Sequence, residues 1–234
     1  MLLDKDARIL VVGAHPDDDV LGCGGTLARA IELGAEVSVM FLGEGVSARF
    51  DDSDLDSPKF HEAMETRTQG ALNALKLLGI TNYEFGTNYC CRFDTIPILT
   101  LVKSVEAKIR EFQPTIVLSH NPAEVNIDHR TTYKVVESAA RPDINSPIHT
   151  ILGFEIVCSG NLGYGETFEP DLYVDIKSHW NQKIAAWNCY VDEEKPFPFP
   201  RSVEGLKTLA KYRGMQSGLE LAEGFRVYRS ILRY

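Results

Sequence analysis

Several features that define large classes of proteins are missing from this sequence. No apolar run approaches the roughly 20 residues needed to cross a bilayer, and Met1–Asp6 lacks the long apolar region of a signal peptide. Basic residues are too few for a polyanion-binding surface, because 24 Lys and Arg stand against 33 Asp and Glu, a formal net charge of −9. We therefore expect a cytoplasmic protein that neither inserts stably into membranes nor binds nucleic acid.

Two kinds of site are also missing. The five cysteines are odd in number and include no C-x-x-C pair, so neither a disulfide framework nor a thiolate zinc site is indicated. The G-x-G-x-x-G of dinucleotide-binding proteins is absent after the first expected strand, where His15-Pro16-Asp17 stands instead. The composition favours a small-molecule substrate as the partner, and it is compatible with a homo-oligomer.

Strand and helix patterns alternate along the first part of the chain. Apolar runs at Ile9–Val12, Glu36–Leu42 and Pro114–Ser119 predict strands, and amphipathic segments lie between them. Such alternation is typical of a parallel sheet with helices on both faces. We expect a Rossmann-like, mostly parallel α/β core over residues 1–150, and a C-terminal extension of strands and helices over residues 151–234 that completes the same single domain.

The other expected elements follow from caps and periodicity. A glycine-rich turn at Gly22, Gly24 and Gly25 is expected before a helix that Gly34 closes. Later helices are expected from Ser57-Pro58 to Gly79, from Asp94 with Pro97 in its first turn, from His129 to before Pro142, over Lys183–Tyr190 and over Val203–Met215. Short strands are expected at Tyr83–Phe85, Leu152–Cys158, Leu172–Ile176 and Phe225–Leu232.

Four ionisable side chains follow the first strand within five residues: His15, Asp17, Asp18 and Asp19. Ligand sites in open α/β sheets form at the carboxyl ends of strands. Charges crowded on a tight turn are costly unless a positive group lies among them, and a divalent metal ion is the simplest such group. His15 and Asp18 suit zinc. Alternatively, the three acids only cap the next helix, whose N-terminus favours negative charge.

A second polar cluster follows the fourth expected strand. The strand ends at His120, and a polar loop leads to Asp128 and His129 at the start of a helix. The ends of these parallel strands meet at one edge, so a histidine from this cluster can complete a three-ligand catalytic zinc site. His129, with Asp128 beside it, is the better candidate.

Together these residues resemble the LmbE-like (PIG-L-type) zinc-dependent N-deacetylases, which remove acetyl groups from N-acetylglucosamine units. Residues 14–19, AHPDDD, match the family pattern A-H-P-D-D-E, and residues 126–129, NIDH, match H-P-D-H or a variant of it. The likeness extends to FLGEG at 41–45, to Arg67 and, more weakly, to AEGF at 222–225. It therefore covers essentially the whole chain.

The resemblance implies that His15, Asp18 and His129 bind one zinc ion and that Asp17 is the general base. Zinc lowers the pKa of bound water from 15.7 to about 7 and polarises a carbonyl, which suits attack on an unactivated amide. The expected reaction is hydrolysis of the acetamide of an N-acetylated amino sugar, with release of acetate and the free amine. Iron or cobalt could replace zinc, because the ligand types constrain the metal only loosely.

Three positions depart from the family pattern: Asp19 replaces a glutamate, Asn126 replaces a histidine in many members, and Gly70 replaces a glutamate that often follows the helix arginine. Without a histidine at 126, the acid for the leaving amine is expected to be Asp17 itself or His120. An N-x-D-H motif suggests a subgroup of the family. The alternative is a catalytically silent member that keeps the metal pocket for sugar binding.

Five further residues are expected around the site. Arg49 and Arg67 are expected to hold substrate hydroxyls or a phosphate, since guanidinium forks suit planar anions. Glu44 and Asn126 are assigned to the substrate, and Asp128 is expected to orient a site histidine. The alternatives are a surface ion pair for each arginine, a solvated turn for Glu44 and a helix cap for Asp128.

Overall fold

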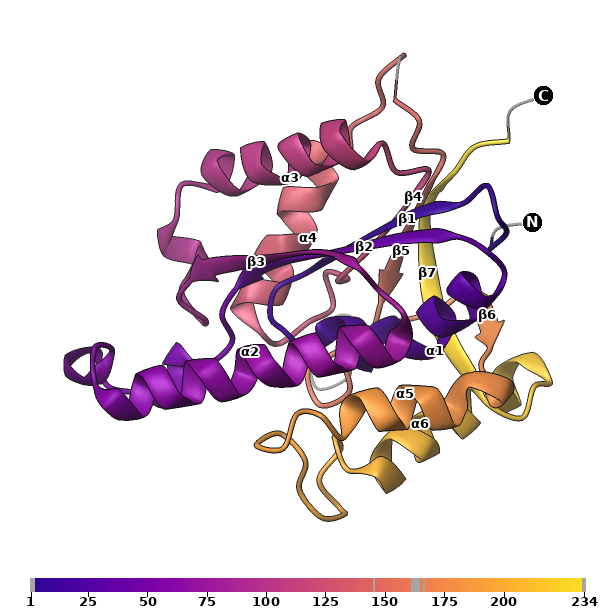
Figure 1. Cartoon of the computed structure of the whole chain (residues 1–234). Helices are drawn as coiled ribbons and strands as arrows, with labels where there is room; N and C mark the ends of the chain where they lie inside the picture. Colours follow the sequence, from indigo (N-terminus) through magenta and orange to yellow (C-terminus); the bar gives the residue numbers. More distant parts are fainter. Residues whose placement is uncertain (1–2, 145, 161–164, 166, 233–234) are drawn as a thin grey trace.

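The computed structural model describes residues 3–144, 146–160, 165 and 167–232. Its centre is a seven-stranded sheet in the order β3-β2-β1-β4-β5-β7-β6 (Figure 1). The strands are β1 Arg8–Gly13, β2 Glu36–Gly43, β3 Asn82–Asn88, β4 Ile116–Ser119, β5 Thr150–Phe154, β6 Leu172–Asp175 and β7 Ala222–Ser230.

Strands β3, β2, β1, β4 and β5 are mutually parallel, whereas β7 runs antiparallel to both β5 and β6. The expected mostly parallel α/β sheet is therefore confirmed. The two antiparallel strands belong to the C-terminal part of the chain and extend the sheet beyond β5.

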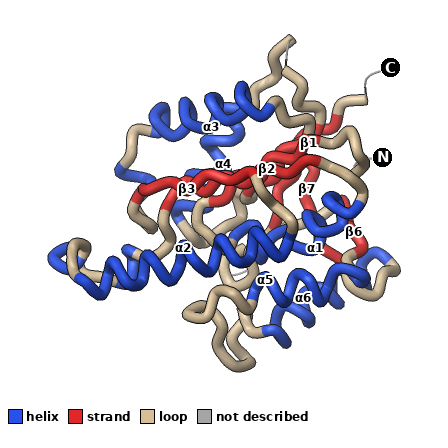
Figure 2. The backbone as a smooth tube through the Cα atoms, viewed as in Figure 1, coloured by secondary structure: helices blue, strands red, loops and turns tan. Residues whose placement is uncertain are grey.

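Helices cover both faces of the sheet (Figure 2). One apolar cluster joins Leu10, Val12 and Val117 to α3 and α4, and the other joins Ile9 and Val11 to α1, α2, α5 and α6. Alternate residues of β1 thus enter opposite cores, which explains why the strand is apolar throughout. The helices are α1 Asp18–Glu32, α2 Pro58–Leu78, α3 Ile98–Phe112, α4 Ile127–Ala139, α5 Trp180–Trp187 and α6 Val203–Ser217. None in the described ranges is long and apolar enough to span a membrane.

The expected glycine-rich turn at Gly22, Gly24 and Gly25 is wrong, because α1 already begins at Asp18 and contains all three glycines. A Cβ atom at Gly22 would lie 2.4 Å from the Phe154 ring, and one at Gly25 would lie 2.7 Å from Ile176. These glycines therefore serve close packing of α1 on the sheet rather than a turn.

Several boundaries also differ from the expected ones. Asp94 lies in a 3-10 turn, Phe93–Thr95, and α3 begins only at Ile98 after Pro97. Strand β5 spans Thr150–Phe154 and ends four residues before the expected Cys158. By contrast, α2 has the caps that its sequence predicts. Ser57 Oγ accepts a hydrogen bond from the Phe60 backbone N–H, Pro58 is the first helical residue, and Gly79 adopts a left-handed φ of 83°.

Candidate metal centre

The structure brings His15, Asp18 and His129 together at the carboxyl edge of the sheet. His15 lies in the β1–α1 connection, Asp18 is the first residue of α1, and His129 lies in the first turn of α4, which follows β4. All three are buried, and one ligand atom from each lies within 4.8 Å of the others. Two imidazole nitrogens and one carboxylate are a donor set that zinc or a similar divalent ion takes in catalytic sites.

Asp128 determines how His15 faces this centre. The His15 Nε2 atom lies 2.8 Å from Asp128 Oδ2, so Nδ1 is the ring nitrogen that Asp128 leaves for a metal. The Asp128 side chain is fully buried, and it also accepts hydrogen bonds from the backbone N–H groups of Cys91 and Phe93. A ligating histidine is commonly oriented by such a carboxylate. The arrangement is the one expected for Asp128.

Glu124 does the same for His129, and sequence reasoning missed it. Its Oε2 lies 3.1 Å from His129 Nδ1, which leaves Nε2 facing Asp18 Oδ1 at 3.5 Å. The carboxylate also accepts hydrogen bonds from Ser159 Oγ and the Ile156 backbone N–H. Glu124 lies in the polar loop before α4, where no periodicity marks an inward-facing side chain; its distance of five residues from His129 was the only signal.

For two of the three ligands, His129 and Asp18, the pKa is shifted toward the form that binds a metal, whereas the hydrogen bond to Asp128 and the nearby carboxylates raise the pKa of His15 despite its burial. Burial, assisted by the neighbouring His120, lowers the pKa of His129, which favours its neutral form. Burial alone would raise the pKa of Asp18, but the His129, His120 and His15 imidazoles together hold it well below its usual range. A neutral imidazole and an ionised carboxylate are the forms that ligate a metal.

His120 lies behind these ligands, not in front of them. Its Nε2 accepts a hydrogen bond from the Ala14 backbone N–H at 3.0 Å, and its ring stacks on His129 with centroids 4.1 Å apart. His120, Glu124 and His129 form a second group with metal-compatible spacing. The first group fits a metal better, because His120 Nε2 and Glu124 already have the partners described above.

A cavity of about 130 Å³ opens in front of the centre. His15, Asp17, Asp18 and His129 line it, and Arg49, Arg67, Asn126, Glu193 and Arg201 surround them. Among the described residues His120 is not part of this lining, so the structure gives no support to His120 as the acid that reaches the leaving amine.

Asp17 faces this cavity from a strained backbone. Its φ is 144°, a conformation that L-residues rarely adopt, and its side chain makes no capping hydrogen bond within the described part of the chain. Instead, Asp17 Oδ2 lies 3.1 Å from Arg67 Nη1 and 3.4 Å from Arg201 Nη1. The alternative that Asp17 only caps α1 is therefore wrong.

Glu193 joins the arginines around Asp17. This buried carboxylate forms ion pairs with Arg49, Arg67 and Arg201, the last at 3.0 Å. Glu193 and Arg201 both lie in the connection between α5 and α6, and sequence reasoning missed both. The sequence marks them only by a charged run at residues 192–195. Because both residues lie more than 170 positions from Asp17, no local pattern relates them to it.

Gly70 explains part of this arrangement. A Cβ atom there would lie 2.7 Å from the Cys189 carbonyl oxygen, so α2 has no room for a side chain at this position. Among the described residues, the carboxylates that pair with Arg67 come from Asp17 and from Glu193, not from α2. The departure at residue 70 is thus matched by a group from the C-terminal part of the chain.

Two of the residues assigned to the substrate have structural partners. The Glu44 carboxylate accepts hydrogen bonds from Val46, Ser47 and Cys90, so it holds its own loop, and among the described residues it does not line the cavity. Asn126 does line the cavity, and its Oδ1 also accepts the Asp128 backbone N–H as the N-cap of α4. Its Nδ2 group has no hydrogen-bond partner among the described residues.

Asp19 is the third acid of the cluster and is wholly buried. Neither carboxylate oxygen has a hydrogen-bond partner among the described residues. Burial, reinforced by Asp17 and Asp18, raises the pKa of Asp19 to about 7. Asp19 therefore neither caps the helix nor ligates with Asp18; it lies in the core behind the centre.

The sheet and the His–Asp–His cluster define an α/β protein with a candidate catalytic metal centre at the carboxyl edge of its strands. The chain belongs to the PIG-L family, GlcNAc-PI de-N-acetylase, whose model matches residues 10–140.

Relatives within this group carry different activities in their names. A diacetylchitobiose deacetylase of Thermococcus kodakarensis is 28% identical, over 94% of this chain and 82% of that protein. A 4-oxalmesaconate hydratase of Pseudomonas putida is 30% identical, over 79% of this chain and 73% of that protein. The structure of N,N'-diacetylchitobiose deacetylase from Pyrococcus horikoshii superposes with a TM-score of 0.78 at 24% identity, covering 98% of this chain and 86% of that one.

Proposed function

We propose that this protein is a metal-dependent N-deacetylase that hydrolyses the acetamide of an N-acetylated amino sugar. The observation that carries the proposal is the placement of Asp17 beside His15, Asp18 and His129, at the wall of a cavity. The deacetylase relative that aligns with 94% of the chain supports the same reaction class.

His15, Asp18 and His129 would hold the metal, with Asp128 and Glu124 fixing the two imidazoles. When bound, a divalent ion such as zinc supplies Lewis acidity toward the amide carbonyl and lowers the pKa of a coordinated water molecule. Asp17 accepts the proton of the attacking water as general base. Arg67 and Arg201 hold its carboxylate in place through the contacts at 3.1 and 3.4 Å.

The same carboxyl group then returns the proton to the departing nitrogen. Asn126 carries no titratable group, and His120 lies behind the ligands with its Nε2 engaged by Ala14. Asp17 is therefore the acid as well as the base in this proposal. Asn126 Nδ2 and Arg49, at the wall of the cavity, are the groups available to the sugar hydroxyls.

A second candidate is hydration of the double bond of an unsaturated carboxylate. Three guanidinium groups, those of Arg49, Arg67 and Arg201, line the cavity and suit carboxylate binding. The Pseudomonas putida hydratase, at 30% identity, makes this reaction relevant. Against it, Glu193 pairs with all three arginines, so none of them is left to a substrate carboxylate alone.

One experiment separates these functions. The zinc-loaded protein is incubated with N-acetylglucosamine, N,N'-diacetylchitobiose and an unsaturated dicarboxylate, and acetate release and loss of the double bond are followed in parallel. The proposal predicts acetate release by the wild type that is slower by about 10²–10⁴-fold in Asp17→Asn. Hydration without acetate release would support the second candidate. Tight binding of an acetylated sugar without any turnover would identify a silent binding protein.

A further inference from the structure

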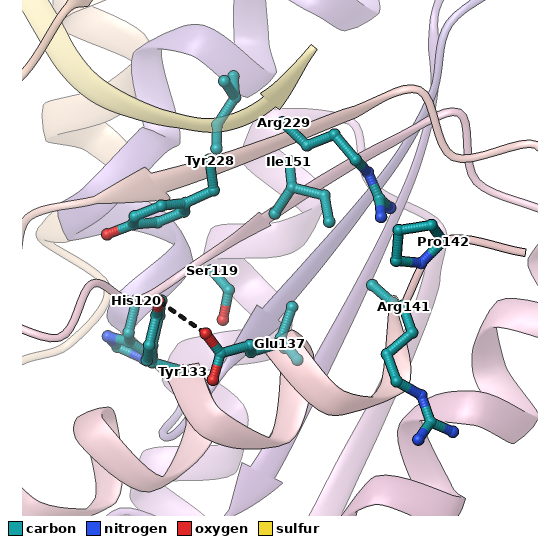
Figure 3. A pocket seen from close by; sticks show the side chains of 12 residues that line it. Ser119, His120, Tyr133, Glu137, Arg141, Pro142, Ile151, Tyr228 and Arg229 are labelled. Carbon is teal, nitrogen blue, oxygen red and sulfur yellow. Dashed lines mark hydrogen bonds between the residues drawn. The ribbon is translucent and has the colours of Figure 1, made fainter. Parts of the chain in front are cut away.

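A second cavity lies on the other side of His120, between α4 and the β5–β7 pair (Figure 3). Its volume is about 330 Å³, at the lower end of the range of ligand sites. The buried residues that line it are Ser119, His120, Val136, Ala140 and Leu152. In the described part of the chain it shares no lining residue with the cavity in front of the metal centre.

An irregularity in the sheet shapes this cavity. Leu152 pairs with Val227 and Ile151 with Arg229, so β7 has one extra residue, Tyr228, opposite β5. A β-bulge of this kind changes the direction of side chains that would otherwise alternate across the sheet. As a result, Tyr228 and Arg229, although adjacent in the chain, both line the cavity (Figure 3).

Gly153 in the neighbouring strand β5 leaves room for the Tyr228 ring at this cavity. A Cβ atom at Gly153 would lie 2.5 Å from the Tyr228 ring, so the absence of a side chain there lets the ring lie over β5. The Tyr228 ring meets the Tyr133 ring of α4 edge to face, with centroids 5.3 Å apart. Two aromatic rings and the buried Val136 and Leu152 thus offer an apolar surface to a ligand.

Arg229 supplies a positive group, and two of its donors have no acceptor in the described part of the chain. These donors, the Nε and Nη2 atoms, are buried. The other charged side chains of the cavity are engaged, since Glu137 accepts from Tyr133 and Arg141 approaches Glu106 at 3.8 Å. Buried donors left unpaired are destabilising, and a carboxylate is the acceptor that matches the guanidinium fork.

His120 also lines this cavity. Its Nδ1 atom is buried and has no partner among the described residues, whereas its Nε2 atom contacts the Ala14 backbone N–H and Asp18. His120 stacks on His129 and lies 3.1 Å from Asp18. This one side chain therefore lies between the cavity and the metal centre.

We propose that this second cavity is a binding site for a small organic carboxylate with an apolar body. The carboxylate pairs with Arg229, and the apolar body packs against Tyr133, Tyr228 and Leu152. The proposal does not depend on the reaction at the metal centre, because binding is measurable without turnover.

Benzoate is the probe for this site, and benzamide is its neutral counterpart. In calorimetric titrations of the metal-loaded protein, benzoate is expected to bind saturably at one site per chain. Benzamide is expected to bind at least about tenfold more weakly, because it cannot form the charged pair with Arg229. Absence of saturable benzoate binding, or equal affinity for the two probes, would overturn the proposal.

Variants locate the bound benzoate. Arg229→Gln is expected to weaken benzoate binding at least about tenfold, and Arg229→Lys to weaken it less, since lysine keeps the charge but loses the fork. Arg226→Gln, on the same strand but paired with Asp171 at 3.0 Å, is the matched control and should leave the affinity unchanged.

The remaining alternative is that benzoate binds the metal itself. Metal-stripped wild-type protein should retain benzoate binding if Arg229 holds the carboxylate. Binding that disappears with the metal and persists in Arg229→Gln and Arg229→Lys would assign benzoate to the metal centre and contradict the proposed site.

Discussion

The two parts of the chain contribute differently to the cavity in front of the metal centre. Residues 10–140, which the family model matches, supply His15, Asp18 and His129 together with Asp17. The C-terminal part supplies Glu193 and Arg201, which surround Asp17 and the arginines. The metal-binding groups therefore come from segments that follow two strand ends, whereas the groups around the base Asp17 come from a distant part of the chain.

The largest loss of activity is expected when the base, Asp17, is replaced. Asp17→Asn removes the proton acceptor but none of the three metal ligands. The rate of acetate release should fall by about 10²–10⁴-fold, the usual contribution of general acid–base catalysis. Metal content, measured by plasma mass spectrometry, should stay at the wild-type value. A variant that loses its metal would show that Asp17 is a ligand instead.

The next effect concerns the residues that orient the histidines. Glu124→Gln and Asp128→Asn weaken the hydrogen bonds to His129 and His15, so metal affinity should fall by about 10–100-fold. Competition with a chelator measures this change. Glu137→Gln, an exposed change on α4, is the control and should retain wild-type affinity. Unchanged affinity in both test variants would mean that these carboxylates do not act on the centre.

A smaller effect is expected from the C-terminal part. Glu193→Gln removes the shared partner of three arginines, so Arg67 and Arg201 are no longer held against Asp17. We expect kcat to fall by about tenfold, the effect of one lost charged interaction, at unchanged metal content. Glu194→Gln, at the exposed neighbouring residue, should behave as wild type. Loss of metal in Glu193→Gln would contradict the view that only residues 10–140 hold the metal, while the C-terminal part acts on Asp17.

The smallest effect on activity, but a clear one on stability, is expected at Asp19. Its pKa of about 7 in the folded protein exceeds its ordinary value of 3.8, so the folded state binds the proton more tightly. The stability that protonated Asp19 contributes is complete below about pH 4 and is lost as the pH rises through 7.

Asp19→Asn cannot ionise and should therefore gain stability relative to wild type over this pH range, by up to about 4 kcal/mol. Urea denaturation of the metal-free proteins is the measurement, because a bound cation would lower the pKa of a nearby carboxylate. A difference in stability that does not change with pH would contradict the account of Asp19.

Much of the fold was predictable because its signals are local. The apolar run at Ile9–Val12 and the Ser57 and Gly79 caps of α2 predict elements that the structure contains. The glycines of α1 were misinterpreted, because their reason is a tertiary one: the close approach of Phe154 and Ile176 to the helix. The β7 bulge at Tyr228 was equally invisible, since it exists only as a register with β5.

The candidate site divides in the same way. His15, Asp18 and His129 were recognisable from two short motifs at strand ends, and the structure brings them together. Glu124 lies in an irregular loop, and Glu193 and Arg201 reach Asp17 only through the packing of the α5–α6 connection, so neither periodicity nor spacing could indicate them. Glu44 shows the opposite error. It lies near a strand end and was assigned to the substrate, but its carboxylate accepts hydrogen bonds from its own loop.

The most direct test of the central claim is the metal content of protein purified without chelator, measured alongside acetate release for wild type and His129→Ala. The account predicts about one zinc or similar ion per chain in the wild type, and loss of both metal and activity in the variant. A wild-type protein that neither contains metal nor releases acetate after zinc is added would contradict it, as would a His129→Ala variant that keeps both.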